Sequence, residues 1–218
     1  MSEASGPMLI FDLDGTLWDS AAQVAESWNI IFTRENPHVV PVTAEDIHNV
    51  MGMTMDEIRD ALRVDVPAER RAEIFRECNT FEVEYLREHG GVPYPGLRPV
   101  MEELRRRGYV LAIVSNCQLG YIDAFLNASG MRDVFADSEE WEHTGLRKGE
   151  NIRLVMERNG FPSAVYIGDT HKDEEAARLA GIPFIHAAYG FGRAEAPDAV
   201  IHSLRELPAV ISRLYPEP

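Results

Sequence analysis

The spacing of hydrophobic and polar positions changes near residue 93, and this change divides the chain into two kinds of structure. Before it, apart from a short apolar run at 8–13, apolar residues recur at the three- and four-residue spacing of helices. After it, short continuous apolar runs alternate with helical patterns. That alternation is typical of a parallel sheet whose two faces are covered by helices, so the sequence predicts an α/β fold.

The first part predicts one buried strand, at 8–13, followed by a block of helices. Thr54 and Glu57 form a capping box, in which each side chain satisfies an exposed amide of the other residue. Gly90 and Gly91 end the last helix of the block, as glycines often do. The expected helices cover 19–34, a short segment opened by Thr43, a second short segment opened by Thr54, and 67–88, with a turn at Met51-Gly52-Met53.

The second part predicts helices and strands in alternation. The first strand lies before the helical block, so we expect this block to be inserted into the core. The core domain would contain 1–19 and 93–218, and a helical domain would contain 20–92. The expected helices are 97–107, 120–128, 150–159 and 173–180, and the expected strands are 109–115, 134–136, 164–168 and 182–186.

Composition and charge narrow the possible partners. The chain has 218 residues, a formal net charge of −15 and a pI near 4.8, so it has no basic field for nucleic acid or an anionic membrane. The longest aliphatic run, 110–114, is too short to cross a bilayer, and residues 2–7 lack a leader pattern, which favours a cytoplasmic location. Cys78 and Cys117 stand far apart without metal-like spacing, which fits a reducing compartment.

Two aspartates follow the first strand, in Asp12-Leu13-Asp14-Gly15-Thr16. Ligands of open α/β sheets bind beyond the carboxyl ends of the strands. Alternation along a strand places Asp12 and Asp14 on the same side, and like charges that close need a cation or a proton between them. We therefore expect a metal site, with a simple strand-ending turn as the alternative. A calcium loop of the EF-hand type is excluded because its spacing and distal glutamate are absent.

Two further stretches offer groups that can hold a phosphoryl group. Ser115 and Asn116 come directly after the apolar run 109–114, at the end of the expected strand, and their hydroxyl and amide can donate to phosphoryl oxygens without adding charge, although such pairs also form turns. Lys148 and Lys172 are the only lysines among 21 basic residues. Lys148 lies between glycines before a helix, which suggests a site that needs a compact ammonium. A solvated surface lysine is the alternative.

The last stretch adds a third strand-end carboxylate. Asp169 follows the strand at 164–168, and Asp173 lies in the first turn of the next helix. If the strands are neighbours, Asp169 completes an oxygen-rich site suited to Mg²⁺. Glu174 and Glu175, in the same turn, are expected only to complement the helix dipole.

In order along the chain, DLDGT at 12–16, Ser115-Asn116, Lys148 and GDTHKD at 168–173 resemble the four motifs of the haloacid dehalogenase-like (HAD) phosphatase superfamily. The resemblance covers essentially the whole chain. It implies a Rossmann-like parallel sheet with helices on both faces, and a helical cap at 20–92 like that of the phosphoglycolate phosphatase and β-phosphoglucomutase subfamily. Members often have proline after the motif lysine, where this chain has Gly149.

The resemblance also implies roles for the matching residues. Asp12 would be the nucleophile and Asp14 the general acid and base. Mg²⁺ would be held by Asp12, the main-chain carbonyl of Asp14 and Asp169, with Asp173 binding it directly or through water. The phosphate-binding groups would be Gly15, Thr16, Ser115, Asn116 and Lys148.

Within the cap, the turn Met51-Gly52-Met53 would lie over the active site and select the leaving group, although methionines also fill cores. Arg59, Arg63 and His48 are candidate contacts to an acidic substrate, with a solvated surface position as the alternative.

We therefore expect a Mg²⁺-dependent phosphatase of a small phosphorylated metabolite, monomeric or homodimeric. The alternatives are a phosphomutase, an inorganic pyrophosphatase and a catalytically idle binding or regulatory module. The cap has no lysine, which argues against a phosphonoacetaldehyde hydrolase. Its first helix has no histidine and Thr16 is not aliphatic, which both argue against β-phosphoglucomutase. Asp14 argues against the dehalogenase branch.

Overall fold

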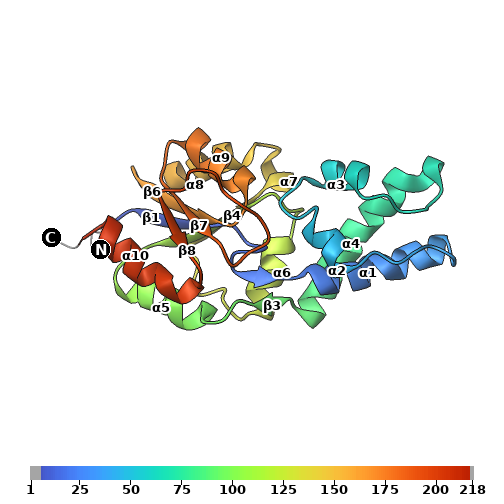
Figure 1. The fold of residues 1–218 in the computed structure, drawn as a ribbon, viewed down its shortest axis with the longest axis horizontal. Coiled ribbons are helices and arrows are strands. Elements are labelled where there is room, and N and C mark those ends of the chain that lie inside the picture. The colour runs from blue at the N-terminus through green and yellow to red at the C-terminus, as the bar shows by residue number, and fades with distance from the viewer. Residues whose placement is uncertain (1–5, 217–218) are drawn as a thin grey trace.

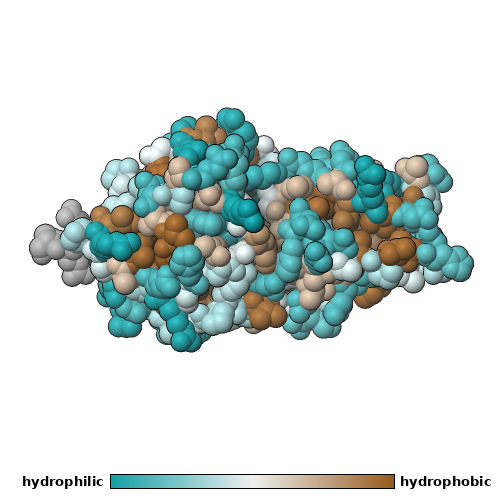
Figure 2. All heavy atoms as spheres, in the orientation of Figure 1, coloured by the Kyte–Doolittle hydropathy of each residue, from teal (hydrophilic) through white to brown (hydrophobic). Residues whose placement is uncertain are grey.

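A computed structural model describes residues 6–216 of the protein. Figure 1 shows an elongated molecule in which an α/β core lies at one end and helices α1 to α4 lie at the other. In the described part of the chain, no helix combines the length and the apolar character needed to cross a bilayer. Figure 2 shows hydrophilic residues over most of one face, with smaller hydrophobic areas on both ends of the molecule.

The core is built on a six-stranded parallel sheet with the order β5-β4-β1-β6-β7-β8, which confirms the predicted α/β fold. The first strand of the chain, β1, lies inside the sheet, where Leu9 is paired with Leu111 of β4 and Val165 of β6. The strands are β1 (Met8–Phe11), β4 (Leu111–Ser115), β5 (Asp137–Glu140), β6 (Ala164–Gly168), β7 (Phe184–Ala187) and β8 (Ala199–Ile201).

Helices cover both faces of the sheet. Alternate residues of β1 point to opposite faces, so they pack against different helices. Met8 and Ile10 pack in the cluster that contains α8 and α9, whereas Leu9 and Phe11 pack in the cluster that contains α5, α6 and α10. All four residues are fully buried. The core helices are α5 (Leu97–Arg106), α6 (Tyr121–Ala128), α7 (Trp141–Thr144), α8 (Lys148–Arg158), α9 (His171–Ala180) and α10 (Leu207–Leu214).

The helical insertion, α1 to α4, leaves and rejoins the core at one place. The short strands β2 (Trp18–Asp19) and β3 (Val92–Pro93) flank it and pair antiparallel. Trp28 and Phe32 of α1 pack against Phe75 of α4 with ring centroids 5.7 and 5.6 Å apart, and these aromatic rings form much of the insertion's own core. Its helices are α1 (Ala21–Glu35), α2 (Ala44–His48), α3 (Met55–Ala61) and α4 (Arg71–His89), with a 3₁₀ turn at Ala68–Arg70.

One predicted strand is wrong. Residues 134–136 are not a strand, because the chain pairs with β4 through the polar residues of β5 instead. Phe135 is buried from a loop and contacts Phe11 edge to face, so the apolar residues cover the sheet beside the strand. Helices α8 and α9 each begin two residues before the predicted positions, at Lys148 and His171.

Candidate active site

The chain turns sharply after β1, and this turn directs two carboxylates out of the sheet. The amide of Asp12 still donates to the carbonyl of Ile167 at 2.8 Å, so Asp12 continues the strand. Gly15 then adopts a positive φ of 78°, a conformation that favours glycine. A Cβ at position 15 would also overlap the carboxylate of Asp169. Gly15 therefore lets the loop after β1 pack directly on the strand-end aspartate of β6.

Lys148 is buried between two carboxylates. Its Nζ lies 3.0 Å from Oδ1 of Asp12 and 2.7 Å from Oδ1 of Asp173, and only 5% of the residue is exposed. Burial opposes the charged ammonium, but Asp12 and Asp173 outweigh it and raise the pKa of Lys148. The structure therefore places a positive charge beside Asp12. The alternative, a solvated surface lysine, is excluded by the burial of Lys148.

Gly149 has a packing role in holding Lys148. It lies in the first turn of α8, where a Cβ would come within 2.7 Å of the Ala176 carbonyl and 2.8 Å of the Leu179 side chain. Helices α8 and α9 thus approach closely at this point. Because Lys148 precedes Gly149 and Asp173 lies on α9, this close approach brings the ammonium to its carboxylate partner.

Asp169 and Asp173 are fixed by main-chain donors. Oδ2 of Asp169 accepts from the amides of Phe191 at 2.8 Å and Gly192 at 3.3 Å. Oδ2 of Asp173 accepts from the amide of Thr170 at 2.9 Å and from its hydroxyl at 2.6 Å, as part of a capping box at the start of α9. Each carboxylate therefore keeps its other oxygen, Oδ1, directed toward the other buried carboxylates of the site.

Asp12, Asp169 and Asp173 form a group suited to a cation. One carboxylate oxygen from each lies within 4.8 Å of the others, and all three residues are buried. Burial, with repulsion from neighbouring carboxylates, raises the pKa of Asp12 and of Asp169. Lys148 is one positive charge among three carboxylates. The unbalanced negative charge and the all-oxygen donor set both fit a divalent metal ion such as Mg²⁺.

Asp14 has a different environment from Asp12. Its Oδ1 accepts from the hydroxyl of Ser20 at 2.8 Å and from the hydroxyl of Tyr121 at 2.9 Å. Burial raises the pKa of Asp14 to about 6, although the two hydroxyl donors partly counteract that rise. A carboxyl group that titrates near neutral pH is suited to give and to take a proton.

The remaining predicted phosphate-binding groups lie around these carboxylates. Ser115 is buried at the end of β4 and lines the same cavity as Asp12. Asn116 also lines this cavity, and its Nδ2 donates to the carbonyl of Gly52 at 3.2 Å, so it contacts the insertion. Thr16 is fully buried and its hydroxyl lies 3.4 Å from Oδ1 of Asp169.

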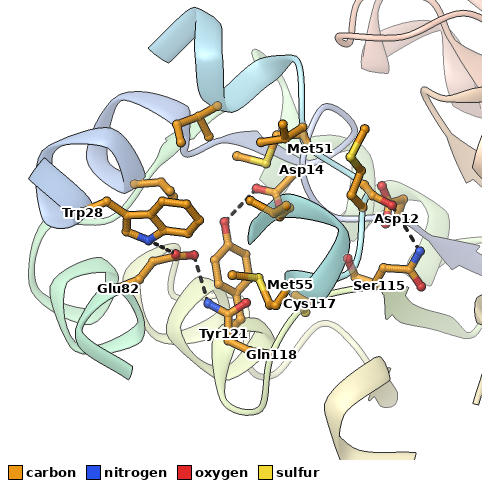
Figure 3. Close-up of a pocket in the computed structure, with 17 residues that line it drawn as sticks. Asp12, Asp14, Trp28, Met51, Met55, Glu82, Ser115, Cys117, Gln118 and Tyr121 are labelled. Carbon is orange, nitrogen blue, oxygen red and sulfur yellow. Dashed lines mark hydrogen bonds between the residues drawn. The ribbon is translucent and has the colours of Figure 1, made fainter. Parts of the chain in front are cut away.

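A cavity between the core and the insertion opens onto Asp12 and Asp14 (Figure 3). The turn residues Met51, Gly52 and Met53 all line it. Other predicted cap contacts lie elsewhere. Arg59 is not among the lining residues, and its guanidinium pairs with Asp56 and Asp60. His48 pairs with Asp19, and Arg63 borders a separate surface pocket near Val40.

The sequence patterns did not identify the other polar groups of this cavity, of which Glu82 is the most unusual. Glu82 shares a buried face of α4 with Phe75, Cys78 and Leu86, so a charged residue on an apolar helical face was the available signal. Its Oε2 accepts from Nε1 of Trp28 at 2.5 Å, and its Oε1 accepts from Nε2 of Gln118 at 3.0 Å. Three elements of the chain meet in this hydrogen-bonded group.

Comparison with known proteins gives consistent matches over nearly the whole chain. Residues 9–187 match the family model of the haloacid dehalogenase-like hydrolases. A phosphoglycolate phosphatase of Agrobacterium fabrum is 30% identical over 228 residues, which cover 98% of this chain and 96% of that protein. A phosphoglycolate phosphatase of Escherichia coli O157:H7 is 26% identical, with 90% and 89% of the two chains covered.

Solved structures share the fold. A predicted phosphoglycolate phosphatase from Haemophilus somnus matches with a TM-score of 0.81 at 19% identity, over 96% of this chain and 99% of that one. CbbY from Rhodobacter sphaeroides, in complex with phosphate, matches with a TM-score of 0.75 at 22% identity, over 92% and 95%.

Proposed function

We propose a mechanism from the premise that this chain belongs to the haloacid dehalogenase-like hydrolase family and is a phosphatase of a small phosphorylated metabolite. In the first step, a carboxylate oxygen of Asp12 attacks phosphorus and the bond to the leaving oxygen breaks. Asp14 gives its proton to the leaving alkoxide. In the second step, Asp14 takes a proton from a water whose oxygen attacks phosphorus. The bond to Asp12 then breaks and inorganic phosphate leaves.

The observation that carries this assignment is the contrast between the two aspartates. Without a metal ion, burial raises the pKa of Asp12 to about 7, above that of Asp14. The ammonium of Lys148 and a cation held with Asp169 and Asp173 would both favour an ionised nucleophile. Asp14 is beside the hydroxyls of Ser20 and Tyr121 and has a pKa raised to about 6, which favours a group that exchanges protons. Two carboxylates in such different environments support a division of roles.

The surrounding residues would bind the phosphoryl group and a metal ion. Lys148 and Ser115 would hold phosphoryl oxygens, and Asp173 would orient Lys148. Asp12, Asp169 and the main-chain carbonyl of Asp14 would hold Mg²⁺, with Asp173 nearby. When bound, this ion would offset negative charge on the phosphoryl group.

We also propose that the helical insertion, residues 20–92, acts as a cap that selects the leaving group. Several contacts join it to the core around the cavity, including the bond of Gln118 to Glu82 described above. Asn116 donates to Gly52, Lys172 pairs with Glu57 at 3.0 Å, and the rings of His48 and Phe191 lie 4.3 Å apart. These contacts support a closed position of the cap over the site. The cap would have to move away from the core to admit substrate.

The test is phosphate release from a panel of phosphorylated metabolites, with Mg²⁺ and then with chelator, by the parent protein and by Asp12→Asn. Phosphoglycolate belongs in the panel because relatives carry the name phosphoglycolate phosphatase. We expect loss of turnover in the variant and with chelator. An Asp12→Asn protein that hydrolyses every ester as fast as the parent would refute the assignment of the nucleophile. Transfer of phosphate within a sugar phosphate, without release, would favour a phosphomutase.

A further inference from the structure

The cavity has a second acidic end, formed by Glu82. Figure 3 shows Trp28 and Glu82 on one side of the cavity, Asp12 and Ser115 on the other, and Tyr121 between them with its hydroxyl directed to Asp14. Glu82 is only 4% exposed, and its two oxygens accept from neutral donors, the indole of Trp28 and the amide of Gln118. Within residues 6–216, no lysine, arginine or histidine forms an ion pair with it. Glu82 is therefore a buried carboxyl group without a protein counter-ion.

The described wall of the cavity has acidic, neutral polar and apolar side chains but no basic one. The charged side chains among its described lining residues are Asp12, Asp14 and Glu82, and none of these lining residues is lysine, arginine or histidine. The remaining wall is largely formed by aliphatic, methionine and aromatic side chains. The apolar and aromatic lining residues are Val24, Trp28, Ile47, Val50, Met51, Met53, Met55, Ile58 and Tyr121.

A wall of this composition would treat leaving groups of different charge differently. A leaving group with a carboxylate would bring an anion toward the carboxyl groups of Asp14 and Glu82, and no basic side chain of the described lining would offset its charge. An ammonium would supply the counter-ion that Glu82 lacks, and the rings of Trp28 and Tyr121 would attract it through their π faces. Burial raises the pKa of Glu82 to about 8, and an arriving cation would favour its ionised form.

We propose that Glu82 binds an ammonium group on the leaving portion of the substrate, so that the substrates are phosphomonoesters of amino alcohols. The proposal rests on the proposed function, because it requires the phosphoryl group to lie at Asp12. The alcohol would then extend past Asp14 and Tyr121, with its methylene groups against the methionine side chains and its ammonium against the carboxylate of Glu82, beside the ring of Trp28.

The experiment compares three matched series of phosphomonoesters of increasing chain length, ending in an ammonium, a hydroxyl or a carboxylate. Phosphate release is measured with Mg²⁺ at about pH 8, close to the raised pKa of Glu82. At the chain length that fits, we expect kcat/KM to be at least about tenfold higher for the amine than for the hydroxyl ester, a difference of about 1.4 kcal/mol. The carboxylate ester should be the poorest substrate. Equal values for amine and hydroxyl esters at every length would overturn the proposal.

Glu82→Gln is the variant that isolates the charge. It keeps the side-chain shape and an acceptor for Trp28, while Gln118 can rotate its amide to present the carbonyl. We expect the ratio of amine to hydroxyl kcat/KM to fall to about one, because the charged contact is worth about tenfold in the parent. Glu88→Gln, an exposed glutamate on the same helix, is the control and should keep the parent ratio. An unchanged ratio in Glu82→Gln would overturn the proposal.

Two further measurements distinguish a failure of the ammonium site from a failure of the proposed function. Competitive inhibition of the parent by free amino alcohols, compared with diols of the same length, repeats the charge comparison without a variant. Stronger inhibition by the amine supports the proposal and equal inhibition contradicts it. If the parent releases phosphate from no ester, or Asp12→Asn is as active as the parent, the proposed function fails. If Asp12-dependent hydrolysis occurs without preference for amines, the ammonium site alone fails.

Discussion

Removing the hydroxyl of Tyr121 should raise the pKa of the proposed acid and base, Asp14. In Tyr121→Phe, Oδ1 of Asp14 loses the donor at 2.9 Å and keeps the hydroxyl of Ser20 at 2.8 Å. Both donors stabilise the ionised carboxylate, so the loss of one favours the protonated form.

The size of this change follows from the energy of one hydrogen bond to a charged group. Such a bond contributes about 1.5–3 kcal/mol, and about 1.4 kcal/mol corresponds to one pKa unit, so the loss predicts a rise of about one to two units. Ser20 loses its 2.7 Å partner Tyr121 as well and can give its hydroxyl wholly to Asp14, which favours the lower end of this range. From about 6 in the parent, the pKa of Asp14 would therefore rise by about one unit.

The assay is the pH dependence of kcat/KM for an alkyl phosphate, whose leaving group needs a proton. Activity requires protonated Asp14 in the first step, so it falls as pH rises through the pKa of Asp14. A higher pKa should move this alkaline limb to higher pH by about one unit. An aryl phosphate, with an acidic leaving group, should depend much less on this proton.

Tyr166→Phe is the matched control. Tyr166 is also buried, but its hydroxyl donates to the carbonyl of Val114 and not to Asp14. This variant should keep the parent's alkaline limb. If the limb of Tyr121→Phe stays in place or moves to lower pH while the protein remains folded, the reasoning about Asp14 is refuted.

Three further changes test the buried charges and the packing around them. Lys148→Met should abolish measurable turnover and lower the free energy of unfolding in urea by about 3–5 kcal/mol, because two buried carboxylates lose their shared cation; a smaller loss than that of an exposed Lys172→Met control would contradict this. Gly149→Ala gains about 0.5–1 kcal/mol of helix propensity but adds overlap with the Ala176 carbonyl that costs about 1–3 kcal/mol, so urea unfolding should show a net destabilisation. Glu82 has a folded pKa of about 8 against an ordinary value of 4.5, so its contribution to stability is present below pH 4.5 and is lost as pH rises through 8. The free energy of unfolding of the parent should fall across this window more steeply than that of Glu82→Gln, and parallel curves would contradict the raised pKa.

The sequence could predict which residues meet at the proposed phosphate-binding end of the cavity because of how parallel strands are arranged. Asp12, Ser115 and Asp169 each follow a short apolar run, and parallel strands place such positions along one edge of the sheet. That these residues lie close together could therefore be predicted without knowledge of any side-chain contact. Lys148 was identified by its rarity and its glycine neighbours, but its pairing with Asp173 depends on the close approach of α8 and α9.

The proposed leaving-group end of the cavity could not be predicted in the same way. Trp28, Glu82, Gln118 and Tyr121 come from α1, α4 and the segment around α6, and they meet only when the insertion packs on the core. Helical periodicity shows which face is buried but not which buried face borders a cavity. Arg59 is an example of a residue that sequence reasoning placed at the cavity by its charge. In the structure, its position on α3 directs the guanidinium to Asp56 and Asp60 instead.

The pairing of β2 with β3 determines where this chain can gain or lose residues without disturbing the main sheet. Trp18 lies opposite Pro93, so the two ends of the helical segment are neighbours, while every strand of the main sheet comes from residues outside that segment. Insertions and deletions between these ends can therefore remodel the insertion's side of the cavity without changing the register of β1 against β4 and β6. In evolutionary terms, the proposed phosphorus chemistry would be inherited with the sheet, whereas the proposed choice of ester would be carried on an exchangeable segment.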